Sequence, residues 1–555
     1  MKSQWLILLT VYAAALNLTS VNCAIVFSDI SVEAGLSNEV YASSGGHGLG
    51  INWVDINNDG WDDLFVVGGG PNYPPKLFIN NKMGAFTNVS QLLPKLPMVE
   101  MSGSRFADFD RDGDKDIYIY TDNPDFRVLN ENQPDGPANL LLTNNWIETG
   151  IINFTESAAL AGVDDLAPVP FGSLPAYRSK TAAWIDYNRD GCIDLYVGHL
   201  VENAGGHEVN RDRLYKNQCD GRFEDVSVIS GVSGGLNPDN YRATLASGAF
   251  HINSDLWPDL YLVNVTGTDS SVYHNDFLYI NQGIGAVETF SEQVGLSLGV
   301  GNDSQAGMGI DIADIDHDGD WDIYISDIFN TTLDEPPLGN VLYLGNGDGT
   351  FAENSAISAG IQGVDSWGVN FFDANNNTWE DLFVATIGTN NGDLFYVNNG
   401  LNDGQHLITF TESALSIGIS TGNARGSAVS DFDRDGDLDF AVVNQNGGLQ
   451  LFRNDSTQIG GWLVLELSAQ ISNLDAIGTV VKIQTGDLVQ MRQVKGGASA
   501  HSQDSLNVHF GLGDSTIVDQ ILVQWPSGET SQFMNIGINQ YFKIFEVDVI
   551  FKNGF

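Results

Sequence analysis

One short acidic loop recurs seven times between Asp55 and Asp439, and this recurrence constrains the fold more than any other feature of the chain. Oxygen-bearing side chains recur at loop positions 1, 3, 5 and 9, and glycine occupies position 6 in five of the seven copies. A hard cation such as calcium takes about six to eight oxygen ligands, and glycine allows the tight turn that points several of them inward. The copies read DINNDGWDD from Asp55, DFDRDGDKD from Asp108, DYNRDGCID from Asp186, HINSDLWPD from His251, DIDHDGDWD from Asp314, DANNNTWED from Asp373 and DFDRDGDLD from Asp431. Seven copies in register predict repeated calcium-binding loops.

The EF-hand is the main alternative, because its calcium loop begins with the same residues. An EF-hand needs a bidentate glutamate at position 12 and amphipathic helices on both sides of the loop. Position 12 is apolar in every copy here: Val66, Ile119, Val197, Leu262, Ile325, Val384 and Val442. The residues after position 9 form short β-branched and aromatic runs such as LFVV and IYIY, which are typical of buried strands. The loops therefore lie between strands, and EF-hands are excluded.

The predicted calcium ligands come from positions 1, 3, 5, 7 and 9 of six loops, with position 7 contributing its backbone carbonyl. In the first three loops they are Asp55, Asn57, Asp59, Trp61, Asp63, Asp108, Asp110, Asp112, Asp114, Asp116, Asp186, Asn188, Asp190, Cys192 and Asp194. In the last three loops they are Asp314, Asp316, Asp318, Asp320, Asp322, Asp373, Asn375, Asn377, Trp379, Asp381, Asp431, Asp433, Asp435, Asp437 and Asp439.

The seven loops differ in the number of carboxylates they offer. Those from Asp108, Asp314 and Asp431 have aspartate at all five positions, so we expect them to bind most tightly. The Asp55 and Asp186 loops have asparagine at position 3, and the Asp373 loop has it at positions 3 and 5 and lacks the glycine. The fourth copy starts with His251, and a hard cation prefers oxygen to imidazole. The sequence therefore predicts five or six calcium ions and none at His251.

The repeat is longer than its loop, because a segment that begins with phenylalanine recurs as well. These segments begin at Phe27, Phe86, Phe154, Phe223, Phe290, Phe351 and Phe410, with spacings of 59, 68, 69, 67, 61 and 59 residues. Such a length holds four short strands, which is the content of one propeller blade. The first segment, Phe27–Ser31, precedes any loop, and the last repeat ends at Asn454 without such a segment. We therefore predict an all-β fold, a seven-bladed β-propeller over residues 24–457, with the N-terminal strand completing the last blade.

The repeats resemble the FG-GAP/VCBS repeats of the integrin α-chain propeller, and this resemblance implies calcium in the loops. The C-terminal part, with GTVVKIQTGDLVQMRQVKGG from Gly478, FGLG at Phe510–Gly513 and WPSG at Trp525–Gly528, resembles the ASPIC/UnbV domain. That domain follows such repeats in the cartilage acidic protein family, and the resemblance implies a small β-rich domain at residues 458–555. The aromatic residue that the family usually has before the Ser-Gln pair is missing, with Ser499 and Ala500 near His501. The calcium-binding EGF module common in animal members is not found before Phe555.

The charge of the chain limits its partners. It holds 71 Asp and Glu against 24 Lys and Arg, which gives a formal net charge of −47. Because 27 of these carboxylates lie in the seven loops, bound calcium would neutralise only part of the charge. Nucleic acid and anionic membranes are therefore excluded as default partners.

Residues 1–23 are predicted to be a secretory signal peptide, because one lysine precedes an apolar stretch and small residues follow near Ala24. The apolar stretch is too short to span a bilayer, and no later run is long enough. A lipid anchor on Cys23 is the less favoured alternative. The protein is expected to be secreted and extracellular, or at the periplasm or cell surface if the source is bacterial.

The two remaining cysteines, Cys192 and Cys219, are predicted to form a disulfide. Cys192 lies in the third loop and Cys219 in the turn between the third and fourth strands of the same repeat. In a four-stranded meander these turns emerge on one side, and an oxidising compartment favours the bond over two buried thiols.

The sequence contains no catalytic triad order, HExxH motif or phosphate-binding loop, and its nine histidines are dispersed. His501 and His509 are expected to be ordinary polar or core residues. Secretion, broad loop surfaces and the resemblance to matrix and adhesion proteins favour a binding module for an extracellular protein or glycan. An extracellular structural scaffold and an enzyme that uses the propeller's central channel remain as alternatives.

Overall fold

The computed structural model describes most of the chain, with gaps. The described residues are 25–36, 40–41, 48–68, 72–97, 99–122, 138–165, 179–200, 212–232, 244–253, 255–264, 276–283, 290–294, 306–328, 339–352, 356–387, 392–401, 408–457 and 460–546. The predicted signal peptide lies outside them. None of the helices in these ranges is both long and apolar enough to cross a membrane.

In the described residues, the repeats form seven antiparallel sheets, here called the repeat sheets, and each takes its strands from one repeat in chain order. The first four contain β3 (Ile51–Val54), β4 (Asp63–Val66), β5 (Lys76–Asn80) and β6 (Phe86–Asn88); β7 (Glu100–Ala107), β8 (Asp116–Asp122), β9 (Leu140–Asn144) and β10 (Phe154–Glu156); β11 (Ser179–Ile185), β12 (Asp194–His199), β13 (Arg213–Asn217) and β14 (Phe223–Asp225); and β15 (Thr244–Phe250), β16 (Asp259–Asn264), β17 (Phe277–Asn281) and β18 (Phe290–Val294).

The last three repeat sheets follow the same order. They contain β19 (Gly307–Ala313), β20 (Asp322–Asp327) and β21 (Val341–Tyr343); β22 (Ser366–Phe372), β23 (Asp381–Thr386), β24 (Leu394–Leu401) and β25 (Ile408–Glu412); and β26 (Ala424–Ser430), β27 (Asp439–Asn444) and β28 (Gly447–Asn454). The short helices are η1 (Ser90–Leu92), α1 (Trp146–Thr149), α2 (Ala158–Ala161), α3 (Ser227–Ser230) and η3 (Ala414–Ile417). The phenylalanine-led segments that form named strands are the outermost strands of their sheets.

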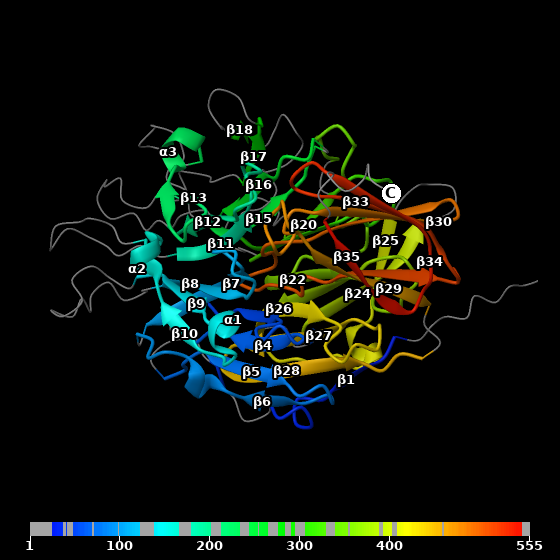
Figure 1. Cartoon of the computed structure of the whole chain (residues 1–555). Coiled ribbons are helices and arrows are strands. Elements are labelled where there is room, and N and C mark those ends of the chain that lie inside the picture. Colours follow the sequence, from blue (N-terminus) through cyan, green and yellow to red (C-terminus); the bar gives the residue numbers. More distant parts are fainter. Residues whose placement is uncertain are drawn as a thin grey trace, which may run out of the picture.

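The N-terminal strand β1 (Phe27–Asp29) joins the last repeat sheet. It pairs antiparallel with β28, with Phe27 opposite Asn454 and Asp29 opposite Phe452. The two-residue strand β2 (Val40–Tyr41) also pairs with β28. Figure 1 shows β1 beside β28 at the edge of the molecule where the first and last repeats meet.

Apolar side chains hold neighbouring repeat sheets together face to face. The first and second strands of each sheet are buried on both faces, which explains their continuous β-branched and aromatic runs. One apolar cluster joins Phe65 of the first sheet to Ile119 of the second, and another joins Trp53 of the first to Ala428 of the last. The first strands of successive sheets lie in contact, and β26 of the last sheet contacts β3 of the first.

An asparagine at the end of the third strand, here called the asparagine latch, also links neighbouring sheets. Its side-chain amide donates to the carbonyl of loop position 2 in the adjacent repeat. The hydrogen bonds run from Asn80 to Phe432 (2.9 Å), Asn144 to Ile56 (3.0 Å), Asn217 to Phe109 (2.7 Å), Asn281 to Tyr187 (2.8 Å), Asn398 to Ile315 (3.1 Å) and Asn454 to Ala374 (2.7 Å). The β19–β21 sheet has Gly345 where the others have asparagine. The Asn80 bond connects the first repeat to the last.

The C-terminal strands form two further sheets. One contains β32 (Val508–Gly513), β29 (Gly461–Ser468) and β35 (Gln540–Phe545), and the other contains β31 (Leu488–Gln493), β30 (Val480–Thr485), β33 (Val518–Gln524) and β34 (Thr530–Ile536). Trp525, Phe510 and Ile521 lie in their shared core, which continues into Trp184 and Tyr118 of the repeat sheets. These strands, orange to red in Figure 1, are gathered on one side of the molecule.

Residues 493–505 of the C-terminal part, here called the insertion segment, hydrogen-bond to the first strand of every repeat sheet. The contacts pair Gln503 with Trp53 and Phe106, Gly496 with Trp184, Gln493 with Ala249, Ser499 with Ile310 and Val369, and Ser505 with Val429. A single segment of 13 residues therefore contacts all seven first strands. The insertion segment therefore ties the repeat sheets to the C-terminal strands.

Candidate metal centres

Five of the acidic loops share one backbone hydrogen-bond pattern, set by the carboxylate at position 1. In the second loop Asp108 accepts hydrogen bonds from the backbone N–H groups of Asp112 (3.1 Å) and Gly113 (2.9 Å). Asp55, Asp186, Asp373 and Asp431 accept from positions 5 and 6 in the same way. The turn folds the chain around this side chain and brings positions 1, 3 and 9 toward one another.

Position 6 has positive φ in all seven loops, including the two without glycine. Leu256 and Thr378 adopt φ of 66° and 87°, a conformation that costs a non-glycine residue about 1–3 kcal/mol. The fold therefore maintains the turn even where the sequence does not favour it. The residue at position 4 also has positive φ in the six loops where it is described. Nothing in the sequence indicated this, because none of these residues is glycine.

Three loops bring three carboxylates together. The groups Asp108–Asp110–Asp116, Asp314–Asp316–Asp322 and Asp431–Asp433–Asp439 each place one oxygen per residue within 4.8 Å of the others. They are positions 1, 3 and 9 of the three loops that the sequence ranks as strongest. Several of these oxygens are buried without a hydrogen-bond partner: Asp110 Oδ1, Asp314 Oδ2, Asp433 Oδ1 and Asp439 Oδ2. Orphaned, buried carboxylate oxygens in a tight group fit a hard cation.

The other predicted ligands differ in what each loop position contributes. In the Asp55, Asp186 and Asp373 loops, positions 1 and 9 still carry carboxylates, but position 3 supplies an amide oxygen instead of a third one. Position 5 lies outside the three-carboxylate groups. Its side-chain oxygen accepts the backbone N–H of position 7, in the pairs Asp59–Trp61, Asp112–Asp114, Asp190–Cys192, Asp318–Asp320, Asn377–Trp379 and Asp435–Asp437. A second acidic group, Asp112–Asp114–Glu148, contains Glu148 of α1, which no loop pattern pointed to.

Burial raises the pKa of the loop carboxyls. Burial and then repulsion from Asp475 raise the pKa of Asp108 to about 8, and burial raises that of Asp431 to about 7. Burial also raises the pKa of Asp63 to about 8 and that of Asp439 well above its ordinary value. Without a cation these groups favour the protonated form, and a bound cation would favour the ionised one.

Position 9 also fixes the neighbouring strand. The Asp63 carboxylate accepts the backbone N–H of Asn80 (2.7 Å) and that of Ile56 at position 2 (3.3 Å). Asn80 is the residue whose side chain forms the asparagine latch to Phe432. The carboxylate at position 9 therefore positions the contact between sheets, and each candidate metal loop is connected to the joint with its neighbour.

The side chain at position 4 reaches the next loop along the chain, and we call this set of contacts the loop belt. It hydrogen-bonds to the backbone carbonyl of position 6 in that loop, from Asn58 to Gly113 (2.7 Å), Arg111 to Gly191, His317 to Thr378 (2.9 Å), Asn376 to Gly436 (3.1 Å) and Arg434 to Gly60. Arg189 instead lies over the ring of Trp257, 4.8 Å from its centre. Arg434 links the last loop to the first.

The fourth loop is held by the C-terminal part. The His251 ring Nε2 lies 2.7 Å from the carbonyl of Gly478, and the backbone N–H of His251 donates to Gln493 Oε1. Burial lowers the pKa of His251, so its ring is neutral near pH 7. The side chain at position 1 of this loop therefore contacts the C-terminal part of the chain.

Cys192 and Cys219 form a disulfide, with 5.6 Å between their Cα atoms. The bond connects the third loop to the turn after β13. The sulfurs are consumed by this bond, so the group of Asp190, Cys192 and Cys219 offers one carboxylate and no thiolate.

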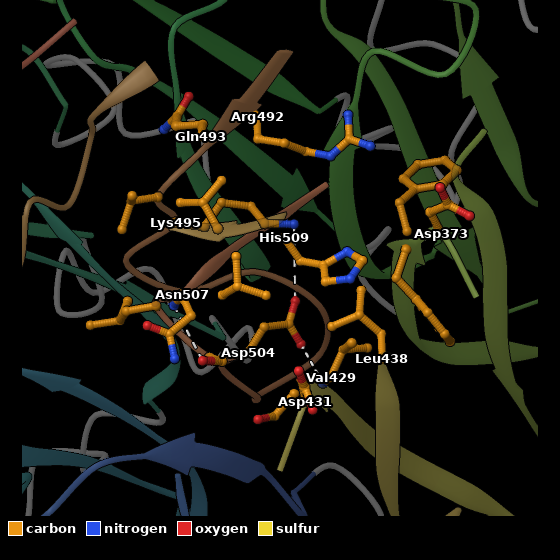
Figure 2. Close-up of a pocket in the computed structure, with 18 of the residues that line it drawn as sticks. Asp373, Val429, Asp431, Leu438, Arg492, Gln493, Lys495, Asp504, Asn507 and His509 are labelled. Carbon is orange, nitrogen blue, oxygen red and sulfur yellow. Dashed lines mark hydrogen bonds and ion pairs between the residues drawn. The ribbon is translucent and has the colours of Figure 1, made fainter. Parts of the chain in front are cut away.

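A cavity of about 100 Å³ lies between the repeat sheets and the C-terminal strands (Figure 2). Charged residues line it: Arg492 lies 2.9 Å from Glu380, and Lys495 lies 4.0 Å from Asp504 and also 2.5 Å from Asp311 behind the lining. His509 Nε2 lies 3.0 Å from the Gly436 carbonyl of the seventh loop, and burial lowers the pKa of His509 to about 4. These ion pairs and this hydrogen bond connect the C-terminal strands to the repeat sheets around the cavity.

Comparisons with known proteins agree with this division. The model of the ASPIC and UnbV family matches residues 469–550, and that of the FG-GAP-like repeat matches residues 55–119. Cartilage acidic protein 1 of Xenopus tropicalis is 23% identical over 502 residues, which cover 86% of this chain and 70% of that protein. The Mus musculus protein is 22% identical over 507 residues, with coverages of 86% and 70%. The chain is thus similar to cartilage acidic protein 1 over most of its length, and it contains segments that match the FG-GAP-like repeat and the ASPIC and UnbV family.

More distant likenesses occur among solved structures. A lectin of Agrocybe aegerita that recognises non-reducing terminal N-acetylglucosamine is 16% identical, with a TM-score of 0.39 over 72% of this chain and 86% of that one. The exotype rhamnogalacturonan lyase YesX is 12% identical, with a TM-score of 0.37 over 77% and 75%. TM-scores this low carry no argument about function.

Proposed function

We propose that this protein is a secreted, calcium-binding module that holds an extracellular protein or glycan. The three groups of buried carboxylates at positions 1, 3 and 9 carry the calcium part of the proposal. Calcium would supply charge neutralisation, which lets these carboxylates stay ionised while buried. The chain's own residues supply the turn and the links to neighbouring sheets.

We propose that residues 24–457 form a closed seven-bladed propeller and that residues 458–555 form the ASPIC/UnbV-like domain. The Asn80–Phe432 hydrogen bond between the first and last repeats supports closure, as does the pairing of β1 with β28. The insertion segment supports it independently, because it reaches the first strand of each repeat sheet. A crystal structure in which the first and last repeat sheets do not contact each other would contradict this proposal.

The proposed ligands are the predicted residues of six loops, and five or six ions are expected. The Asp108, Asp314 and Asp431 loops should bind most tightly because each groups three carboxylates. The His251 loop should stay free of calcium because its ring bonds to Gly478. Asn375 and Asn377 make the Asp373 loop the weakest of the six, because they replace carboxylates by neutral oxygens.

The binding role rests on the predicted signal peptide and on the relation to cartilage acidic protein 1. An enzyme that uses the centre of the propeller is less well supported, because the insertion segment already hydrogen-bonds to the first strands there. In an oxidising environment the Cys192–Cys219 disulfide would persist, which agrees with secretion.

Native mass spectrometry and isothermal titration test the calcium part, and a glycan and protein array probed with and without calcium tests the binding part. We expect five or six ions and array binding that a chelator abolishes. The variant Asp433→Asn should lose one tight ion, while Asp487→Asn, an exposed turn residue of the C-terminal domain, should lose none. A protein that binds no calcium at millimolar concentration would refute the metal proposal.

A further inference from the structure

Six first strands carry a register shift near their start. At each shift one residue or two are left out of the pairing with the second strand, and such bulges redirect side chains. The residues concerned are Ser102, Lys180, Leu245, Met308, Trp367 and Arg425, here called the bulge cluster. All six are buried.

Part of the bulge cluster meets beside the insertion segment. Leu245, Met308 and Trp367 form one apolar group together with Ala500 of that segment. The guanidinium of Arg425 lies over the Trp367 ring, 4.3 Å from its centre. Arg425 stands near the start of β26, whereas the acidic loop that begins at Asp431 follows its end. The bulge cluster therefore lies at the other end of the first strands from the candidate metal loops.

Arg425 is buried without a charged partner among the described residues. Only 8% of its surface is exposed, and its Nε and Nη1 atoms are buried with no hydrogen-bond partner. Burial lowers the pKa of Arg425 to about 10, and no carboxylate in the described residues raises it again. Other buried or half-buried cations in the described residues lie beside a carboxylate, as in Lys180–Asp122, Lys115–Asp475, Lys495–Asp311 and Arg492–Glu380.

Arg105 is the nearest comparison, because it too is fully buried and forms no ion pair in the described residues. Its Nε donates to the carbonyl of Ala182 (2.8 Å) and its Nη1 to that of Ser104 (3.0 Å), so two of its three nitrogens are hydrogen-bonded and only Nη2 has no partner. Arg425 has no such bonds. In a chain with 71 acidic and 24 basic residues, a buried guanidinium without a carboxylate leaves a strong donor group for something outside the chain.

We propose that Arg425 binds the carboxylate of an organic ligand at the bulge cluster. Stacking on Trp367 fixes the plane of the guanidinium, and its Nε and Nη1 atoms, buried without a partner in the described residues, are donors that match the oxygens of a carboxylate. Because Leu245 and Met308 are buried in one cluster with the same tryptophan, the side chains around the guanidinium are apolar and suit the carbon skeleton of an organic acid. Glucuronate is a suitable probe of this chemistry.

This inference adds a ligand class to the proposed binding role, and the two can fail separately. Calcium binding is measured by ion count, and the carboxylate site is measured in protein already loaded with calcium. If the ion count is five or six and glucuronate does not bind, only the carboxylate site is wrong.

The test is titration of calcium-loaded protein with glucuronate, with glucose and sodium sulfate as separate arms, followed by thermal melting. We expect glucuronate to bind, Arg425→Met to weaken binding at least tenfold and Arg425→Lys to weaken it less. Without ligand, Arg425→Met should raise the melting temperature by a few degrees, because it removes an unpaired buried charge. The matched control, Arg222→Met, removes an exposed arginine paired with Asp220 and should leave glucuronate binding unchanged.

Three outcomes would overturn the proposal. Equal glucuronate affinity in the wild-type and Arg425→Met proteins would place the site elsewhere. Glucose binding as tightly as glucuronate would show that the carboxylate is not recognised, and sulfate binding more tightly would identify a site for inorganic anions. A lower melting temperature for ligand-free Arg425→Met would show that the guanidinium is structural.

Discussion

Replacing Asp433 by alanine should destabilise the protein only when calcium is present. Asp433 is position 3 of the seventh loop and groups with Asp431 and Asp439. This loop belongs to the sheet that β1 completes, and its Arg434 reaches the first loop through Gly60. Loss of its ion should therefore weaken both a turn and the link between the last repeat and the first.

The magnitude follows from two limits. A site with an affinity of about 0.1 mM, in about 1 mM calcium, contributes roughly 1.4 kcal/mol to the free energy of unfolding. The rise in the pKa of Asp431 from 3.8 to about 7 corresponds to roughly 4 kcal/mol, the cost of ionising this buried group without a cation. Asp433→Ala should thus cost between about 1.4 and about 4 kcal/mol in calcium. Asn375→Ala, in a loop with two carboxylates, should cost less than about 1 kcal/mol.

Chemical denaturation in 1 mM calcium and in excess chelator measures both variants. Asp487→Ala is the matched control, because it removes one exposed carboxylate outside the loops. The difference between Asp433→Ala and Asn375→Ala should vanish in chelator, where both proteins lack the ion. Equal losses in calcium, or a difference that persists without it, would refute the reasoning.

Two further predictions concern the metal-free protein and the joints between sheets. Burial raises the pKa of Asp108 to about 8 and of Asp431 to about 7, so the folded state holds these protons more tightly than the unfolded state. This stabilisation is complete below about pH 4 and is lost as pH rises through 6 to 8, so metal-free protein should melt at a higher temperature at pH 5 than at pH 8. A melting temperature that is flat over this range would contradict it. Asn80→Ala should cost about 1–3 kcal/mol in chemical denaturation, because it leaves the carbonyls of Phe432 and Asp62 without their donor. The exposed neighbour Asn81→Ala should cost less, and an equal cost would argue against the asparagine latch.

The loops in which three carboxylates meet could be predicted from the sequence because the grouping depends on local geometry. Positions 1, 3 and 9 converge within one turn, so counting aspartates identified the loops of Asp108, Asp314 and Asp431, in which three carboxylates meet. The disulfide was predictable for the same reason, since Cys192 and Cys219 lie in turns of one repeat. Local turns need no knowledge of the rest of the fold.

Contacts between repeats were harder to predict because they depend on which sheets are neighbours. The donors at position 4 vary between asparagine, arginine and histidine, so Asn58 and Arg434 share a role without sharing a residue type. The recurring third-strand asparagine was visible in the sequence, but its partner in another repeat was not. Arg425 gave no signal, because a single basic residue at a strand end is common. Its isolation becomes evident only when its neighbours are known.

The pairing of β1 with β28 has a consequence for the timing of folding. Phe27 pairs with Asn454, so the two partners are separated by 454 − 27 = 427 residues. At a synthesis rate of roughly 5–20 residues per second, β28 is made about 20–85 seconds after β1. During this interval β1 is a strand without its partner, and unpaired strand edges can recruit other chains. Its three-residue length limits the number of backbone hydrogen bonds that a wrong partner could form before the right one is made.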